Sequence, residues 1–366
     1  MKKVNPIVQW WMTPKLPYHD IFEFPLLMNR SWLGKLLHFL PHWIIHPVKR
    51  RLARLYLKAL KRFTDIKVIG VTGSAGKSTT VQMISSILGS LGRTVATPPS
   101  IDPIYNVPNT ILRCAPGTKF LILEMSVEYP GEMDFYLSLV KLDIGVITNI
   151  FPTHTEFLGD TEGVLKEKGK LVLSLEKGGV AVLNKGDERL RGLATKVKAK
   201  VVWFEGGNDD CASVVGRLLG AGSTDIKKGL KDYERPKHRY EIIKHESGAV
   251  IFDDSYNSNP EALLETLRKF NKLAGENIKV AVIGDMLELG DLAISQHKRI
   301  GKGIKKYNFE KVFGVGKLTK YITSDNFDLW EKVVPHLSKY LKPKSYILIK
   351  GSRSIGLERL VLKLTQ

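Results

Sequence analysis

Residues 67–80 decide the fold, and they read Lys67-Val-Ile-Gly-Val-Thr-Gly-Ser-Ala-Gly-Lys-Ser-Thr-Thr80. The β-branched run of residues 67–71 predicts a short strand, and residues 77–91 have a helix pattern that starts directly after the glycine-rich turn. A strand, a loop and a helix in this order open an α/β domain. The same order is the context that a phosphate-binding loop requires.

The turn contains the residue types that hold phosphate. Its glycines allow backbone amides to point inward, Lys77 can neutralise phosphate oxygens, and the hydroxyl of Ser78 can bind Mg²⁺. The strict pattern has glycine where this chain has Val71, so a glycine turn without a nucleotide is the alternative. The residues predicted to contact the nucleotide are Gly73, Ser74, Ala75, Gly76, Lys77, Ser78 and Thr79.

Apolar runs on the C-terminal side of this stretch predict two sheets of an α/β protein. Parallel strands that are covered on both faces have such continuous apolar runs. The first set of predicted strands is 120–123, 144–148, 180–183 and 201–204, and the second set is 250–252, 280–283, 311–315 and 346–349. Helices of the second set are expected from about residues 261, 294, 328 and 356. We expect a central P-loop ATPase domain with a parallel sheet over residues 65–236 and a Rossmann-like domain over 237–366, with the boundary near Arg235-Pro236.

Residues 1–64 form a short basic segment that contains four of the six tryptophans. Twelve Lys and Arg against Asp20 and Glu23 give it a charge of 12 − 2 = +10, out of +19 for the chain. Residues 48–63 predict an amphipathic basic helix, because apolar side chains recur at steps of three and four. These apolar residues are Val48, Leu52, Leu55, Tyr56, Ala59, Leu60 and Phe63.

Three roles are open for this segment. Its cations and aromatic residues suit the surface of an anionic membrane. The helix could instead pack its apolar stripe on the ATPase domain, which is at least as good an expectation. Nucleic acid is the third option, and no recognised nucleic-acid fold accompanies the charge.

Composition limits the class of protein. A chain of 366 residues with 43% hydrophobic and 25% charged residues is typical of a globular protein of two or three domains. Cys114 and Cys211 stand far apart without metal-ligand spacing, and no leader pattern opens the chain, so we expect a cytoplasmic protein. No run of about 18 uncharged apolar residues is present, and no membrane span is expected.

The loop of residues 72–80 resembles that of the Mur ligases and their folylpolyglutamate synthetase relatives, and later segments resemble further motifs of that family. These segments are Leu123-Glu-Met-Ser126, Pro130-Gly-Glu-Met133, Ile147-Thr-Asn-Ile150, His154-Thr-Glu156, Lys166-Glu-Lys-Gly169, Leu183-Asn184 with Asp187, Arg239, Asp253-Asp-Ser-Tyr-Asn-Ser-Asn-Pro260, Gly284-Asp-Met-Leu-Glu-Leu-Gly290 with His297, and Lys350-Gly-Ser-Arg353. The resemblance covers residues 65–366. Its later motifs most resemble the branch that adds D-alanyl-D-alanine to a UDP-muramoyl tripeptide.

The resemblance implies ATP-dependent, ADP-forming amide ligation. Joining a carboxylate to an amine is uphill in water, so ATP first phosphorylates the acid, and cations must hold the two polyanions together. The expected catalytic residues are Lys77, Glu124, His154 and Lys168. The expected Mg²⁺ ligands are Ser78, Glu124, His154 and Lys168, the lysine as a carbamate, because an unmodified ammonium would repel the metal.

In the C-terminal part the resemblance implies that Arg239, Asp253 and Asn257 contact the nucleotide. Asp253, Asp254 and Asn257 could also form a turn and a helix N-cap, since Ser258-Asn-Pro260 suits a helix start. Taken singly, Glu124 is more often a surface carboxylate, His154 a structural histidine and Lys168 a solvated lysine. Their order and spacing behind a phosphate loop favour the functional interpretation.

Two departures from the family concern the acceptor. Residues 1–64 do not resemble the uridine-binding domain of relatives that take UDP-muramoyl substrates, and residues 204–231 look shortened. We therefore expect D-alanyl-D-alanine addition to a peptidoglycan precursor or a similar cell-envelope peptide, with ATP and Mg²⁺ as cofactors. One alternative is a related ligase with a non-UDP or lipid-linked acceptor. Alternatives of another class are a P-loop kinase or nucleotide switch and a membrane-associated binding protein.

Overall fold

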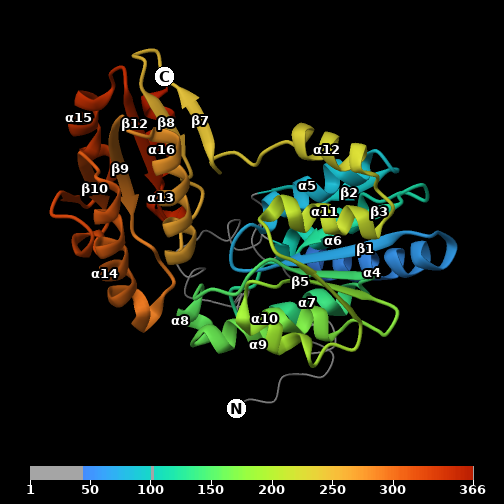
Figure 1. Cartoon of the computed structure of the whole chain (residues 1–366). Helices are drawn as coiled ribbons and strands as arrows, with labels where there is room; N and C mark the ends of the chain where they lie inside the picture. The colour runs from blue at the N-terminus through green and yellow to red at the C-terminus, as the bar shows by residue number, and fades with distance from the viewer. Residues whose placement is uncertain (1–43, 100–102, 366) are drawn as a thin grey trace. The chain divides into compact units, whose positions relative to one another are not determined.

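The computed structural model describes residues 44–99 and 103–365, and the chain divides into two compact units (Figure 1). The first contains the described residues up to Ile150 together with Thr161–Glu234. The second contains Phe151–Asp160 and Arg235–Gln366. Each unit has its own six-stranded sheet, so the predicted α/β class is confirmed.

The sheet of the first unit is parallel throughout, as its apolar runs predict. Its strands run in the order β2-β3-β1-β4-β5-β6. They are β1 (Lys67–Thr72), β2 (Thr94–Ala96), β3 (Phe120–Glu124), β4 (Ile144–Ile147), β5 (Val180–Asn184) and β6 (Lys200–Phe204). The sequence does not predict β2, which has three residues and lies at an edge of the sheet. The strand order places β1, which leads into the glycine-rich turn, in the middle of the sheet.

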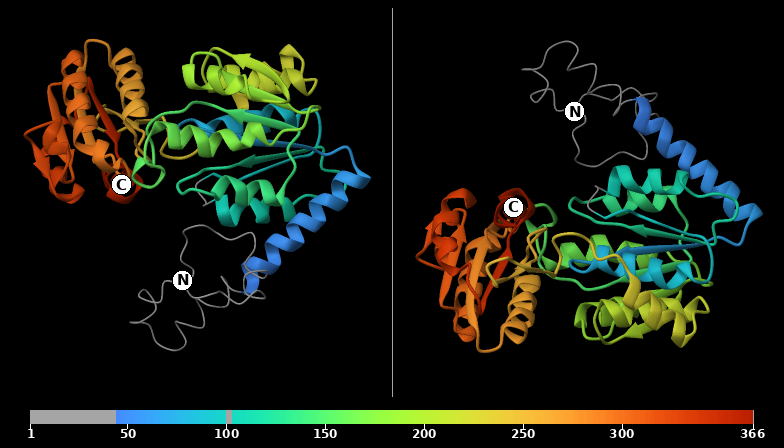
Figure 2. Two further views of the ribbon diagram at one scale, coloured as in Figure 1. Left: turned by 90° about the horizontal axis from the view of Figure 1, so that it is seen from below. Right: turned by 90° about the horizontal axis from the view of Figure 1, so that it is seen from above.

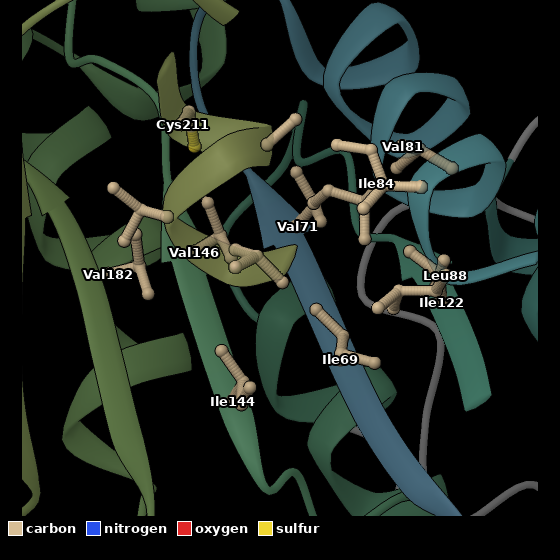
Figure 3. Close-up of a cluster of buried hydrophobic side chains, with 14 of the residues drawn as sticks. Ile69, Val71, Val81, Ile84, Leu88, Ile122, Ile144, Val146, Val182 and Cys211 are labelled. Atoms are coloured by element: carbon tan, nitrogen blue, oxygen red, sulfur yellow. The ribbon is translucent and has the colours of Figure 1, made fainter. Parts of the chain in front are cut away.

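Helices cover both faces of this sheet. They are α4 (His46–Phe63), α5 (Lys77–Gly89), α6 (Pro103–Leu112), α7 (Glu132–Leu139), α9 (Thr161–Leu173), α10 (Glu188–Ala194), α11 (Asn208–Leu218) and α12 (Ser223–Asp232). Figure 3 shows the core between α5 and the strands, where Ile84 and Leu88 face Ile69 and Val71. Helices α11 and α12 contribute to the same core, which fixes α5 and therefore the turn at its start.

The first unit is short between β6 and α11, as the sequence predicts. Only Glu205–Gly207 separate the end of β6 from the start of α11. Asn208 is therefore the first residue of a helix that packs on α5. This arrangement brings the start of α11 near the start of α5.

The second unit is a doubly wound sheet with an antiparallel edge strand. Its strand order is β11-β10-β9-β12-β8-β7, and the pairs other than β7–β8 are parallel. The strands are β7 (Glu241–Lys244), β8 (Val250–Asp253), β9 (Ile278–Gly284), β10 (Lys311–Val315), β11 (Asn326–Phe327) and β12 (Ser345–Lys350). The α-helices are α8 (Thr155–Leu158), α13 (Pro260–Ala274), α14 (Ala293–Ile304), α15 (Val334–Leu337) and α16 (Leu357–Leu364). The predicted Rossmann-like fold is confirmed.

The helix expected from about residue 328 differs from the structure. A 3₁₀ turn, Trp330–Val333, precedes α15, and another, Ser338–Tyr340, follows it. Pro335 lies at the start of α15 and lacks the amide that would continue a helix from the preceding turn. Edge strands β7 and β11 are also missing from the sequence prediction, because they are short and β7 is half exposed.

Helix α4 belongs to the first unit and packs on α6 and α7 (Figure 2). Its buried face carries Ala53, Leu57 and Leu60. The hydroxyl of Tyr56 donates to the carbonyl of Cys114 at 2.7 Å, and Lys61 Nζ lies 2.9 Å from Asp143 Oδ2. The helix is thus fixed to the sheet domain, and of the apolar stripe that the sequence shows, Leu60 and Tyr56 take part in this packing.

The other large residues of the stripe are exposed. Val48, Leu52, Leu55 and Phe63 lie on the side of the helix that faces away from α6 and α7. Among the described residues, no helix is long and apolar enough to cross a bilayer. The four tryptophans Trp10, Trp11, Trp32 and Trp43 lie outside the described residues.

Candidate active site

The glycine-rich turn connects β1 to α5 in the middle of the first sheet. Gly73 has φ +145°, and a Cβ there would lie 1.9 Å from Thr148 Oγ1. Gly76 has φ +81°, and a Cβ there would lie 2.4 Å from Asn208 Oδ1. Both positions therefore require glycine, and the turn is held closely between β4 and α11.

Residues at the end of β4 hold the turn by hydrogen bonds. Thr148 Oγ1 donates to the carbonyl of Ala75 at 2.6 Å. Asn149 Oδ1 accepts from the amide of Ala75 at 2.8 Å, and the carbonyl of Asn149 accepts from the amide of Ser74 at 3.0 Å. These contacts fix the conformation of the turn.

Thr148 and Asn149 lie in one of the family-like motifs but were not predicted to hold the turn, and Asn208 lies in none of these motifs. A signal was present for the first two, because β4 neighbours β1 and both residues directly follow it. The carboxyl ends of parallel strands meet at one edge of the sheet, where open α/β sheets bind their ligands. Asn208 had no such signal, because its position depends on the packing of α11 against α5.

Lys77 and Ser78 occupy the first turn of α5. Lys77 Nζ donates to the carbonyl of Gly73 at 3.0 Å, so the ammonium lies over the turn. The start of α5 has no acidic residue and presents backbone amides at the positive end of the helix dipole. The arrangement fits an anion with several oxygens, such as a polyphosphate.

Glu124 lies at the carboxyl end of β3, directly beside β1. Its backbone pairs with that of Val71, and its amide donates to Thr97 Oγ1 at 2.9 Å. The side chain is half exposed. A carboxylate therefore stands at the same edge of the sheet as Ser78, as the sequence predicts.

Lys168 is completely buried, with 0% of its surface exposed. Its Nζ donates to the carbonyl of Val127 at 3.2 Å. Burial, followed by the charge of Lys77, lowers the pKa of Lys168 to about 7, although nearby Glu132, Glu128 and Glu167 act in the opposite direction. Lys168 is therefore not the solvated lysine of the alternative interpretation.

Two buried glutamates hold the loop that faces Lys168. Glu132 Oε2 accepts from the amides of Glu128 and Tyr129, at 2.6 and 3.0 Å. Glu167 Oε1 accepts from the amides of Gly131 and Met133, at 2.9 and 3.1 Å. The quoted sequence motifs contain both residues, but their positioning of the loop became visible only in the structure.

His154 belongs to the second unit, whereas Lys168, Glu124 and the phosphate loop belong to the first. His154 has φ +55°, and its Nδ1 lies 2.5 Å from Glu288 Oε2. The hydrogen bond from His154 lowers the pKa of Glu288 below its ordinary value. The sequence groups His154 with Lys168, and the side-chain contact that the structure describes for His154 is with Glu288, in the same unit.

In the second unit, the guanidinium groups of two arginines lie over the ring of one tyrosine. The Arg239 and Arg353 guanidinium carbons lie 4.2 and 5.0 Å from the centre of the Tyr256 ring. Arg239 Nε is buried and has no hydrogen-bond partner among the described residues. A buried guanidinium nitrogen without a partner is costly, and an anionic ligand would satisfy it.

Asp253 and Asn257 differ in their access to a ligand. Asp253 is fully buried, with Oδ2 2.7 Å from His238 Nδ1 and Oδ1 accepting from the amide and hydroxyl of Ser255. Asn257 is exposed. The helix start suggested by the sequence is present, because Asn259 Oδ1 caps α13 at the amide of Ala262.

Asp254 forms a buried ion pair with Lys350, which lies 96 residues away in the sequence. Lys350 Nζ lies 2.6 Å from Asp254 Oδ2 and also donates to the carbonyl of Asn257 at 2.9 Å. Thr266 Oγ1 donates to Asp254 Oδ2 at 2.7 Å. The pair joins the end of β12 to the loop before α13 and fixes the backbone of Asn257.

The first unit fits a magnesium nucleotide. The cradle at Gly73 and Gly76, the ammonium of Lys77 and the start of α5 suit phosphate. Ser78 and Glu124 offer the oxygen ligands that Mg²⁺ prefers. Lys168 fits a metal only as a carbamate, because an ammonium has no lone pair to offer.

Comparison with known proteins agrees with this geometry. Residues 71–227 match the Mur ligase middle domain, and residues 238–353 match the Mur ligase, glutamate ligase domain. The UDP-N-acetylmuramoyl-tripeptide--D-alanyl-D-alanine ligase of Bacillus subtilis (strain 168) is 30% identical, over 87% of this chain and 79% of its own. The Escherichia coli (strain K12) enzyme of the same name is 24% identical, over 82% and 77%.

Solved structures show the same fold. A crystal structure of MurF from Acinetobacter baumannii has a TM-score of 0.79 and 24% identity, over 87% of this chain and 80% of its own. The MurF ligase from Thermotoga maritima, solved in complex with ADP, has a TM-score of 0.78 and 24% identity, over 87% and 83%. The predicted family is confirmed, and the chain belongs to the Mur ligases.

Proposed function

We propose that the chain is an ATP-dependent, ADP-forming ligase that activates a carboxylate as an acyl phosphate and joins it to an amine. The observation that carries the proposal is the buried Lys168, whose pKa is about 7, within the electrostatic reach of Lys77 on the phosphate loop. A kinase or nucleotide switch has no need of such a lysine. The names of the similar proteins support D-alanyl-D-alanine as the amine and a UDP-muramoyl tripeptide as the acid.

The phosphate loop supplies binding and charge neutralisation. Backbone amides of Gly73–Thr79 surround the phosphates, and Lys77 neutralises the charge that develops on the transferred phosphoryl group. Ser78 and Glu124 would hold Mg²⁺, which supplies a fixed positive charge between the two polyanions when it is bound. Positioning and electrostatics are the main contributions that phosphoryl transfer needs from a protein.

Lys168 acts in this proposal as a carbamate. A pKa of about 7 leaves a large fraction of the amine neutral near neutral pH. The neutral nitrogen attacks CO₂, a C–N bond forms as one C–O π bond opens, and one proton of the attacking amine leaves to water. The product carries a negative charge and two oxygens, which converts a group that repels a metal into one that can bind it.

The second unit contributes nucleotide contacts in this proposal. Arg239, with its buried Nε, pairs with a phosphate or carboxylate, and the exposed Asn257 contacts the nucleotide. Asp253 acts indirectly, because it is buried and orients His238. His154 keeps its expected role as a Mg²⁺ ligand in this proposal, because the contact of Nδ1 with Glu288 would orient the ring and leave Nε2 to the metal.

A screen of acids and amines for ADP production tests the proposal. UDP-muramoyl tripeptide, lipid-linked precursors and simpler cell-wall peptides serve as acids, each with and without D-alanyl-D-alanine. The proposal expects ADP formation that requires both partners. ADP formation that requires the amine but occurs only with lipid-linked acids would favour the non-UDP acceptor. ADP release in the absence of an amine would favour a kinase or switch.

We also propose that the protein works in the cytoplasm, peripherally at the inner face of the membrane. The support is the charge of +10 on residues 1–64, since a basic segment with aromatic residues suits an anionic surface. Nucleic acid is not favoured, because the family match accounts for the fold without a nucleic-acid module.

A further inference from the structure

We propose that the exposed face of α4 is the docking surface for an anionic lipid bilayer. This inference deepens the peripheral location proposed above and is independent of the ligase chemistry. The outer stripe of α4 is defined here as Val48, Leu52, Leu55, Ala59 and Phe63. The basic edge of α4 is defined as Arg54, Lys58 and Arg62.

The outer stripe is a continuous apolar surface. Its members follow one another at steps of four, three, four and four residues, which places them on one side of a helix. Leu52 is 54% exposed, Leu55 65% and Phe63 80%. Single exposed apolar residues are normal on a protein surface, but a row of large ones along one helix marks an interaction site.

The helix does not need this stripe to pack on its own domain. Ala53, Leu57 and Leu60 already bury the opposite side, and Tyr56 and Lys61 form hydrogen bonds to the first unit. Helix α4 therefore has a packed side and an exposed apolar side. One joins it to the ATPase domain, and the other faces away from that domain.

The basic edge shows which partner fits the outer stripe. Arg54, Lys58 and Arg62 are exposed and stand four residues apart, so they repel one another along the helix. Residues 46–63 contain no Asp or Glu, and no ion pair of these three side chains occurs within the described ranges. An external anionic surface would relieve the repulsion and cover the leucines at the same time.

A bilayer with anionic headgroups combines both properties. An amphipathic helix lies in the interface with its apolar side among the acyl chains and its cations at the phosphate level. Nucleic acid would use the basic edge but would leave the outer stripe in water. A purely apolar protein partner would use the stripe but would desolvate the three cations without compensation.

Flotation of the full chain with lipid vesicles tests whether the basic edge of α4 contributes to membrane binding. Vesicles of phosphatidylcholine with phosphatidylglycerol should bind the protein and release it at high salt, and vesicles of phosphatidylcholine alone should bind far less. R54Q/K58Q/R62Q should lower the partition coefficient roughly a hundredfold, since each basic residue at an anionic surface contributes about a fivefold factor. The matched control is K227Q/K228Q/K231Q, which removes the same charge from exposed positions of α12.

A second pair of variants tests the apolar stripe. L52S/L55S should lose vesicle binding even at low salt, while L329S/L362S, at similarly exposed leucines of the second unit, should keep it. All four variants should keep the wild-type melting temperature and ATP turnover in the absence of vesicles. Failure of the docking proposal therefore leaves the proposed ligase activity untouched.

Three outcomes would overturn the inference. An equal loss with the α4 and α12 charge variants would show that overall charge drives binding. A lowered melting temperature in L52S/L55S, together with no vesicle binding by the wild type, would show that the stripe is covered by the chain itself. Binding of the protein to a nucleic acid that fully displaces vesicles would assign the basic edge to nucleic acid, provided that L52S/L55S binds the nucleic acid as tightly as wild type does.

Discussion

The buried Nζ of Lys168 lies 3.2 Å from the carbonyl oxygen of Val127, in a loop that Glu132 and Glu167 hold by their carboxylates. A lysine is seldom buried completely unless it is paired, because removing an ammonium from water is costly. In this chain the burial lowers the pKa of Lys168 to about 7. The first two predictions follow from this relationship.

Replacing Lys168 by alanine should lower ligase activity by roughly a hundredfold or more, because a charged group at the site of phosphoryl transfer is lost. Acetate or bicarbonate should restore part of the rate, since a small carboxylate can occupy the space of the proposed carbamate. Lys166→Ala, an exposed lysine of the same helix, is the matched control and should be fully active. Full activity of Lys168→Ala would remove Lys168 from the mechanism.

The stability of the protein should depend on pH through Lys168. Between pH 7 and the ordinary lysine pKa of 10.5, the unfolded chain binds a proton that the folded chain does not, so stability rises with pH in this window. Below about pH 7 the folded protein must bury a charged ammonium. In urea unfolding experiments in CO₂-free buffer, the free energy of unfolding of wild type should therefore increase relative to that of Lys168→Met from pH 7 to pH 10. A stability difference that is constant with pH would contradict the lowered pKa.

Replacing Lys77 by alanine should abolish ATP turnover, with at least a hundredfold loss, because the ammonium lies over the phosphate cradle. The side chain is only half buried and lies outside the apolar core, so the melting temperature should stay close to that of wild type. Lys67→Ala, at the exposed start of β1, the strand that precedes the turn, is the control. Normal turnover in Lys77→Ala would show that the turn holds no phosphate.

Replacing Gly73 by alanine should weaken nucleotide binding and destabilise the fold by about 1–3 kcal/mol, because φ is +145° and the added Cβ meets Thr148. The variant should show a raised Kd for ADP by calorimetry and a lowered melting temperature. Gly178→Ala adds the same methyl group in open space and should change neither quantity. Unchanged ADP affinity in Gly73→Ala would show that nucleotide binding does not depend on the backbone conformation at Gly73.

The sequence predicted the parts of the fold that depend on local pattern. The strand that precedes the phosphate loop, the helix that follows it and the apolar strands of both sheets are all present. These strands are continuous apolar runs that alternate with helix-like segments, which is the pattern of parallel strands covered on both faces. Edge strands β2 and β11 were not predicted because they have three and two residues, and β7 because half of its residues are exposed.

The contacts around the site could not be predicted because they join distant segments. Asn149 holds the phosphate loop from 74 residues away, and Lys350 pairs with Asp254 from 96 residues away. The sequence also left open whether the α4 stripe packs on the domain or faces outward. An amphipathic pattern identifies an apolar side, but smaller residues such as Ala53 can form the packed face instead.

Oxygen-isotope transfer tests the central claim most directly, because it follows the atom that an acyl phosphate must hand over. The acid substrate is prepared with ¹⁸O in its terminal carboxylate, and the wild-type chain is incubated with ATP, Mg²⁺ and D-alanyl-D-alanine. When the amine displaces phosphate from the acyl carbon, one carboxylate oxygen leaves with the phosphate. The account predicts one ¹⁸O in each released phosphate and none when Lys77→Ala is used. Phosphate that carries oxygen from water alone would contradict carboxylate activation.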